Sequence, residues 1–242
     1  MSPSPKLAFY DFDGTLTSGN IVKRYAYLAW RDPSRLRAAV KYAKTVVSIP
    51  SWLMLESRSR REFNKVFFRG YRGMHEVLLR VQARELFEEE ILPSIYADAR
   101  KLLTEDLLHG YLPVLVSGEL DFALDRVVKY LGFQAAICNR LVFKKGIATG
   151  EVETPLIAEE EKVRAMERLC QQYGTELKQC KAYSDSFSDL PMLEAVGIPV
   201  AVNPDRRLKR VARKRAWTIL KLKGGIDVRR SREQAPGGIA GA

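Results

Sequence analysis

The chain has 242 residues, of which 46% are hydrophobic and 29% are charged. This composition is sufficient for one domain with a substantial core and a smaller insertion, and it excludes a predominantly disordered chain. The net charge of +11 favours anionic partners, namely phosphorylated substrates, acidic lipid surfaces or nucleic acid, with a merely solvated basic surface as the alternative.

The positive charge is unevenly distributed along the chain. Residues 18–90 contain 15 Lys and Arg against 8 Asp and Glu, and residues 205–242 contain 12 against 3. Residues 91–204 instead contain 12 basic and 16 acidic residues. An anionic partner is therefore expected to meet the early segment or the C-terminal segment.

The cysteines and the N-terminus predict a cytoplasmic protein. Cys138, Cys170 and Cys180 form no CxxC pair and fit no zinc-site spacing, which is typical of ordinary thiols in a reducing compartment. The first residues do not have the pattern of a signal peptide. The apolar, uncharged run of residues 45–55 is too short to span a bilayer and contains Pro50.

In chain order, residues 6–12 predict a short buried strand that ends in an Asp-rich turn with Gly14. From residue 21 to residue 90, apolar side chains recur at spacings of three and four, which predicts helices separated at Pro33 and Pro50. Helices and strands then alternate. The helices are predicted at 96–108, 122–131, 159–173, 190–196 and 205–215, the strands at 111–116, 135–138, 179–183, 198–202 and 217–220, and a hairpin at 141–152.

This alternation predicts an α/β fold, a doubly wound, Rossmann-like parallel sheet with helices on both faces. The helical stretch from residue 21 to residue 90 is interpreted as a cap inserted after the first strand. The predicted domains are a catalytic core of residues 1–17 and 91–223 and a cap of residues 18–90, followed by a disordered tail at 224–242.

Polar residues mark the ends of the predicted strands, where ligands bind in an open parallel sheet. These residues and one lysine at the start of a predicted helix are the candidate site residues: Asp11, Asp13, Ser117, Gly118, Lys162, Asp185 and Asp189.

The residue types indicate phosphate chemistry. Of two carboxylates spaced i, i+2, one can attack while the other handles protons, which suits Asp11 and Asp13. A cluster of carboxylates without His or Cys indicates a hard cation, which with phosphate means Mg²⁺. The Ser117 hydroxyl and the Lys162 ammonium would hold phosphoryl oxygens.

Four segments resemble the four motifs of the haloacid dehalogenase-like hydrolases. They are DFDGTLT at 11–17, VLVSG at 114–118, Lys162 and YSDSFSDLPML at 183–193. The helical insertion resembles that of subfamily IB, the subgroup containing phosphoserine phosphatase, and the resemblance extends over residues 6–220.

The resemblance implies a Mg²⁺-dependent phosphatase that forms an aspartyl-phosphate. In that family pattern, Asp11 attacks phosphorus, and Asp13 protonates the leaving oxygen and then activates water. The Mg²⁺ ligands are Asp11, the backbone carbonyl of Asp13 and Asp185, with Asp189 in support. Ser117, Gly118 and Lys162 bind the phosphoryl group.

Three positions depart from the phosphoserine phosphatase pattern. Ser184 replaces the glycine that opens the fourth motif, and Glu119 replaces a second glycine after Gly118. Asn20 stands where those enzymes have a glutamate that pairs with the serine ammonium. A neutral amide is a poor partner for a cation, so we expect a substrate other than phosphoserine.

Several alternatives stay open. The enzyme alternatives are phosphoserine phosphatase itself and a phosphotransferase; the non-enzyme alternative is a membrane- or nucleic-acid-binding protein that retains the fold. The expected partner is a small phosphorylated substrate, with a lipid-like one as the alternative. No stable nucleic-acid partner is expected, because residues 206–215 predict a helix with one core-facing stripe. The apolar, basic stretch 25–55 predicts either a self-packing lid or weak peripheral contact with a membrane.

Overall fold

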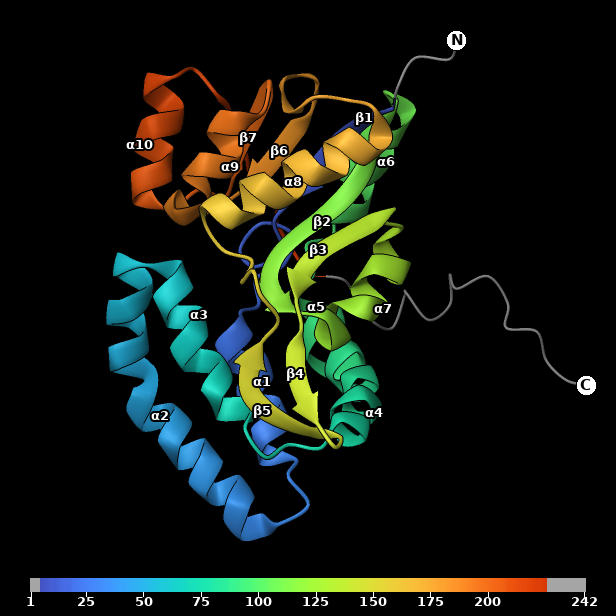
Figure 1. Ribbon diagram of the computed structural model, residues 1–242. Coiled ribbons are helices and arrows are strands. Elements are labelled where there is room, and N and C mark those ends of the chain that lie inside the picture. The colour runs from blue at the N-terminus through green and yellow to red at the C-terminus, as the bar shows by residue number, and fades with distance from the viewer. Residues whose placement is uncertain (1–4, 226–242) are drawn as a thin grey trace, which may run out of the picture.

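The computed structural model describes residues 5–225, except for the side chain of Ser57. Nearly all of the predicted tail at 224–242 therefore lies outside the described residues. A six-stranded sheet occupies the upper part of the molecule (Figure 1). All its neighbouring strands are parallel, in the order β3 (Ala135–Asn139), β2 (Tyr111–Leu120), β1 (Lys6–Tyr10), β6 (Lys181–Ser184), β7 (Ile198–Val202) and β8 (Thr218–Leu220).

Helices cover both faces of the sheet, as the side chains of β1 show. Leu7 and Phe9 belong to the apolar cluster formed with α8 (Glu160–Tyr173), α9 (Leu190–Ala195) and α10 (Arg206–Lys214). Ala8 and Tyr10 belong to the cluster formed with α6 (Ala99–Leu108) and α7 (Asp121–Leu131). Because successive side chains of a strand point to opposite faces, a strand buried on both faces is apolar throughout. The predicted doubly wound α/β class is thus confirmed.

The predicted insertion is helical and lies below the sheet in Figure 1. The helical elements between β1 and α6 are α1 (Ile21–Trp30), α2 (Arg35–Arg58), α3 (Arg60–Phe68), the 3-10 turn η1 (Arg69–Tyr71), α4 (Glu76–Leu86), the π-helical turn η2 (Phe87–Ile91) and α5 (Leu92–Ser94). Helix α2 continues through Pro50, so the predicted separation of helices at that residue was wrong.

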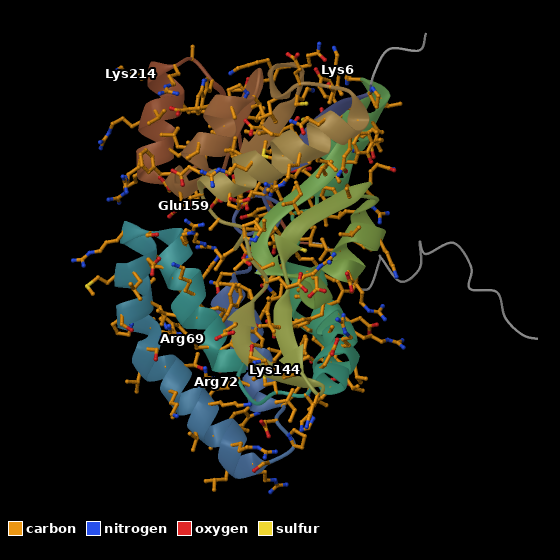
Figure 2. All side chains as sticks on the ribbon, in the orientation of Figure 1. Lys6, Arg69, Arg72, Lys144, Glu159 and Lys214 are labelled. Carbon is orange, nitrogen blue, oxygen red and sulfur yellow. The ribbon has the colours of Figure 1, made fainter. Side chains whose placement is uncertain are left out.

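A two-stranded antiparallel hairpin, β4 (Leu141–Lys144) and β5 (Ile147–Val152), joins this helical region. The Gly73 N–H donates to the Ala148 carbonyl at 2.9 Å, and the Ala148 N–H donates to the Met74 carbonyl at 2.8 Å. The Arg72 side chain also donates from Nε to the Thr149 carbonyl at 2.9 Å; Figure 2 labels Arg72 in this region. The hairpin thus packs with the cap helices, although the sequence grouped it with core residues 91–223. The domain boundaries themselves stay a prediction.

One local expectation was wrong. Ser117 and Gly118 do not end their strand, because β2 continues to Leu120. The pairing of β2 with β3 shifts register between Val116 and Leu120. Such an irregularity bends a strand and re-aims its side chains, so these two residues reach the site from within the strand. Among residues 5–225, no helix combines the length and the apolar character of a bilayer-spanning segment.

Candidate active site

The site begins where β1 and β6 end side by side. Tyr10 of β1 is in register with Tyr183 of β6, and the Asp11 N–H continues the ladder to the Tyr183 carbonyl at 2.9 Å. This register brings Asp11 and Asp185, which follow the two strands, to one edge. The turn after Asp11 needs Gly14, whose φ is +78° and at which a Cβ would lie 2.0 Å from Asp185 Oδ2.

Thr15 links the two carboxylates. Its hydroxyl accepts a hydrogen bond from the Asp185 N–H at 3.0 Å. The same oxygen lies 3.3 Å from Asp11 Oδ2 and 3.2 Å from Asp185 Oδ1. A fully buried threonine therefore sets the relative position of both acids.

Lys162, in the first turn of α8, brings a buried cation to the site. Its Nζ lies 2.8 Å from Asp11 Oδ1 and 2.8 Å from Asp189 Oδ1. Burial opposes the charge of the lysine, but the Asp11 and Asp189 carboxylates outweigh burial and raise the pKa of Lys162. The Ser184 hydroxyl donates to Asp189 Oδ2 at 2.8 Å, so Asp189 is held in place beside the lysine.

The carboxylates outnumber this one cation. Burial raises the pKa of Asp11 to about 6; Lys162 opposes the rise, and Asp189 and Asp13 add to it. Burial, together with Asp11 and Asp189, raises the pKa of Asp185 to about 8. Clustered acids with raised pKa values are typical of a site that takes a further cation.

The donor set fits a hard cation such as Mg²⁺. Asp11 and Asp185 supply carboxylate oxygens, and the Asp13 carbonyl would supply a third oxygen. In the described part of the chain, no three His, Cys, Asp or Glu side chains form a metal-holding group. The expected set consists of two side chains and one backbone oxygen, so that finding does not test it.

Asp13 is paired with an arginine that the sequence did not single out. Arg24 of α1 forms ion pairs with Asp13 and with Glu119, the latter at 2.6 Å from Nε to Oε2. Arg24 and Glu119 are almost completely buried. Burial raises the pKa of Glu119, and Arg24 opposes that rise. Glu119, which departs from the family glycine, is thus a counter-ion for the arginine that contacts Asp13.

The sequence does contain a pattern that indicates the burial of Arg24. It falls on the same helical face as Ile21, Tyr25 and Leu28, which are all buried. A charged residue on an apolar stripe indicates a buried ion pair.

A cavity of about 220 Å³ opens over these groups, between the sheet edge and the cap. The seven predicted residues, Asp11, Asp13, Ser117, Gly118, Lys162, Asp185 and Asp189, all line it. The cap contributes Glu56 and Arg60, which form an ion pair with each other, and Asn20.

A glutamate joins the cap to the core. Glu159, just before α8, accepts hydrogen bonds from the Arg60 N–H at 2.7 Å and from the Ser59 hydroxyl at 3.1 Å. Figure 2 shows Glu159 between the sheet region and the cap helices. Its carboxylate lies at the N-terminus of α3, where negative charge is stabilised by the helix dipole. The sequence did not assign this role to Glu159.

One buried polar side chain of the cap lacks a partner. Asn64 of α3 is fully buried, and neither polar atom of its amide has a hydrogen bond within the described residues. A Cβ on Gly118 would lie 3.1 Å from Asn64 Nδ2, so the amide lies next to the predicted phosphoryl-binding segment.

With this geometry in place, comparison with known proteins defines the class. A model of the haloacid dehalogenase-like hydrolase family matches residues 8–194. The chain belongs to this family, as the four sequence motifs predicted.

Individual relatives agree with that assignment. The chain is 35% identical over 168 residues to a probable phosphatase of Mycobacterium tuberculosis, covering 69% of this chain and 58% of that protein. It thus spans little more than half the length of that relative. It is 29% identical over 220 residues to a phosphoserine phosphatase of the same species, covering 88% of this chain and 69% of that protein.

Solved structures share the fold. One describes a phospho-aspartyl intermediate analogue of phosphoserine phosphatase, with a TM-score of 0.68 and 22% identity. The match covers 95% of this chain and 98% of that one. At this identity the likeness concerns the fold alone.

Proposed function

We infer that the protein is a Mg²⁺-dependent phosphatase that hydrolyses a phosphomonoester by way of a phosphoryl group carried on Asp11. The observation that carries this inference is the contact of Asp11 with Lys162 at 2.8 Å, at a sheet edge where Asp185 also lies. Family membership supports it, as do relatives named phosphatases.

The chain's own groups account for both halves of the reaction. The Asp11 carboxylate attacks phosphorus, and the bond from phosphorus to the leaving oxygen breaks as Asp13 gives that oxygen a proton. Asp13, now ionised, takes a proton from the water that attacks the aspartyl-phosphate, which releases inorganic phosphate and restores Asp11. Lys162 and the Ser117–Gly118 segment bind the phosphoryl oxygens.

A Mg²⁺ held by Asp11, Asp185 and the Asp13 carbonyl would neutralise phosphoryl charge at this edge. Lys162 remains necessary beside it, because Asp189 would otherwise be a buried carboxylate without a cation. Cap residues form part of the cavity wall opposite the sheet edge, where they would limit the access of bulk water to the phosphoryl group.

The cavity supports a small polar alcohol as the leaving group. On the cap side its lining includes the charged side chains of Glu56 and Arg60 rather than an apolar surface. These groups favour a substrate with hydroxyl, amine or carboxyl substituents over one with an acyl chain.

Phosphoserine is a weaker candidate than the relatives' names suggest. Asn20, at the position of the serine-binding glutamate, caps α1 by accepting a hydrogen bond from the Lys23 N–H at 2.9 Å. Its oxygen is therefore occupied by the helix, and its amide carries no charge for an ammonium group.

The test is hydrolysis of an aryl phosphate by the full chain with Mg²⁺. Asp11→Asn should abolish turnover, whereas Asp98→Asn, an exposed aspartate outside the cavity, should not change it. Full activity of Asp11→Asn would overturn the mechanism. A screen of phosphorylated metabolites that includes phosphoserine would define the substrate, and product analysis with added alcohols would reveal transfer to an acceptor other than water.

A further inference from the structure

Helix α2 is attached to the rest of the protein along one face only. It has 24 residues, which corresponds to a length of about 36 Å. Its buried side chains are Ala38, Thr45 and Trp52, spaced seven residues apart. Figure 1 shows the helix at the outer edge of the molecule, with α1 and α3 beside it. One narrow stripe therefore attaches this long helix to the cap.

The opposite side of α2 is apolar and exposed. Leu36 is 76% exposed and Val47 is 79% exposed, and Val40 is also exposed. At 3.6 residues per turn, these three lie within about 40° of one another around the axis, and Thr45 lies about 180° from Leu36. Further exposed apolar residues on α2 lie on one flank of this side, about 80–140° from Leu36 around the axis: Tyr42, Val46, Ile49 and Leu53. Folding of the chain alone does not account for an apolar surface of this extent.

Basic residues accompany the apolar stripe. Helix α2 contains five Lys and Arg but a single acidic residue, Glu56. Lys44 and Arg58 are exposed, and within residues 5–225 neither forms an ion pair. Around the helix, Lys44 lies about 80° and Arg58 about 40° from Leu36, so both border the stripe. An apolar face bordered by Lys and Arg is typical of helices that lie in a membrane interface.

Charge and apolar character together distinguish the three classes of partner that could bind this face. A second copy of this chain would place one basic helix against another, and like charges in contact oppose association. Nucleic acid would satisfy the cations but not the apolar stripe, whereas an anionic lipid surface satisfies both. We propose that the outer face of α2 docks on the surface of an anionic lipid bilayer.

Docking would affect the catalytic cavity through one connection. The last turns of α2 carry Glu56, which lines the cavity and pairs with Arg60. A membrane that holds α2 therefore also holds one wall of the cavity, while the exposed stripe itself lies outside the cavity. This proposal does not depend on the phosphatase reaction, because binding can be measured without turnover.

Co-sedimentation of the full chain with vesicles tests the proposal. We expect binding to vesicles of phosphatidylcholine mixed with phosphatidylglycerol, little binding to pure phosphatidylcholine, and weaker binding at high salt. Val47→Asp should weaken binding about tenfold or more, since it removes one apolar anchor and adds a repelled charge. Lys44→Gln should weaken it about fivefold.

The matched control is Val77→Asp on α4, which makes the same change at a side chain that is 75% exposed. It should bind like the unaltered chain. Leu36→Asp repeats the test on α2 if Val47→Asp is unstable. Equal binding of both aspartate variants would overturn the proposal and assign binding to another region, such as basic residues 205–242. Absence of vesicle binding, or a dimer that Val47→Asp dissociates in analytical ultracentrifugation, would also overturn it.

Discussion

The buried ion pairs of Arg24 offer the sharpest test of how the cap is attached to the catalytic residues. Arg24 contacts Asp13 and Glu119, and its side chain is 3% exposed. Arg24→Met preserves much of the apolar volume but leaves both carboxylates without a cation. Since Glu119 is buried to the same degree, it cannot regain the solvation it lost on folding.

Removal of one partner from a buried ion pair costs about 3–5 kcal/mol of unfolding free energy. Asp13 keeps some contact with solvent, so we expect the lower end, about 3 kcal/mol. With a urea m-value of about 2–3 kcal/mol/M, the unfolding midpoint should fall by about 1–1.5 M. Activity should fall as well, because Asp13 loses the group that positions it.

Urea unfolding followed by circular dichroism measures this effect. Arg31→Met is the matched control, because Arg31 pairs with Glu85 and Glu89 at the surface and its loss should cost about 1 kcal/mol or less. Adding Glu119→Gln to Arg24→Met should restore part of the lost stability, since it removes an unpaired buried charge. A midpoint shift for Arg24→Met no larger than that for Arg31→Met would refute the reasoning.

Three further outcomes are expected. Gly14→Ala should nearly abolish activity, because its Cβ would displace Asp185. The control is Gly110→Ala, at a residue with a similar φ of +80° and open space around it. It should keep activity and lower the unfolding free energy by only about 1–2 kcal/mol, the cost of a Cβ at positive φ. Glu159→Gln should raise the Michaelis constant about two- to tenfold, because it removes the negative charge at the N-terminus of α3. Glu160→Gln, at the exposed neighbouring residue, should leave the Michaelis constant unchanged. Equal constants for the two variants would contradict the role of Glu159 in joining the cap to the core. The folded, metal-free protein keeps a proton on Asp185 up to about pH 8, whereas the unfolded chain releases it near pH 4, so the melting temperature in EDTA should fall as pH rises between these values. Asp185→Asn should reduce that fall, and an unchanged slope would argue against the assignment.

The placement of the acidic site residues was predictable from sequence because it depends on strand ends. Asp11 and Asp185 each follow a short apolar strand, and parallel neighbours bring their carboxyl ends to one edge. Lys162 was identified from its place in the motif order, and the structure brings it within 2.8 Å of Asp11. Local periodicity also predicted most helices and strands to within a few residues, since apolar spacing reflects burial directly.

The supporting contacts were not predictable in the same way. Arg24 and Glu119 are 95 residues apart, and their ion pair depends on how α1 is rotated against β2. Glu159 meets α3 across the junction of cap and core, and the hairpin at 141–152 packs against cap residues far earlier in the chain. Single-sequence patterns do not identify the partners in such pairs: the apolar stripe of α1 indicates that Arg24 is buried, but nothing local points to Glu119.

Helix α2 shows most clearly which features follow from the sequence and which follow from the tertiary structure. Its sequence by itself determined helical residues that are apolar, aromatic and basic together, but it predicted a break at Pro50, which lies inside the 24-residue helix. Apolar residues occur on nearly every side of it, so periodicity could not select the face that packs inward. Only the tertiary structure decided that the stripe through Ala38, Thr45 and Trp52 is buried and that Leu36 and Val47 face outward. The reason is physical: a helix buries the face for which its neighbours, here α1 and α3, provide a complementary surface.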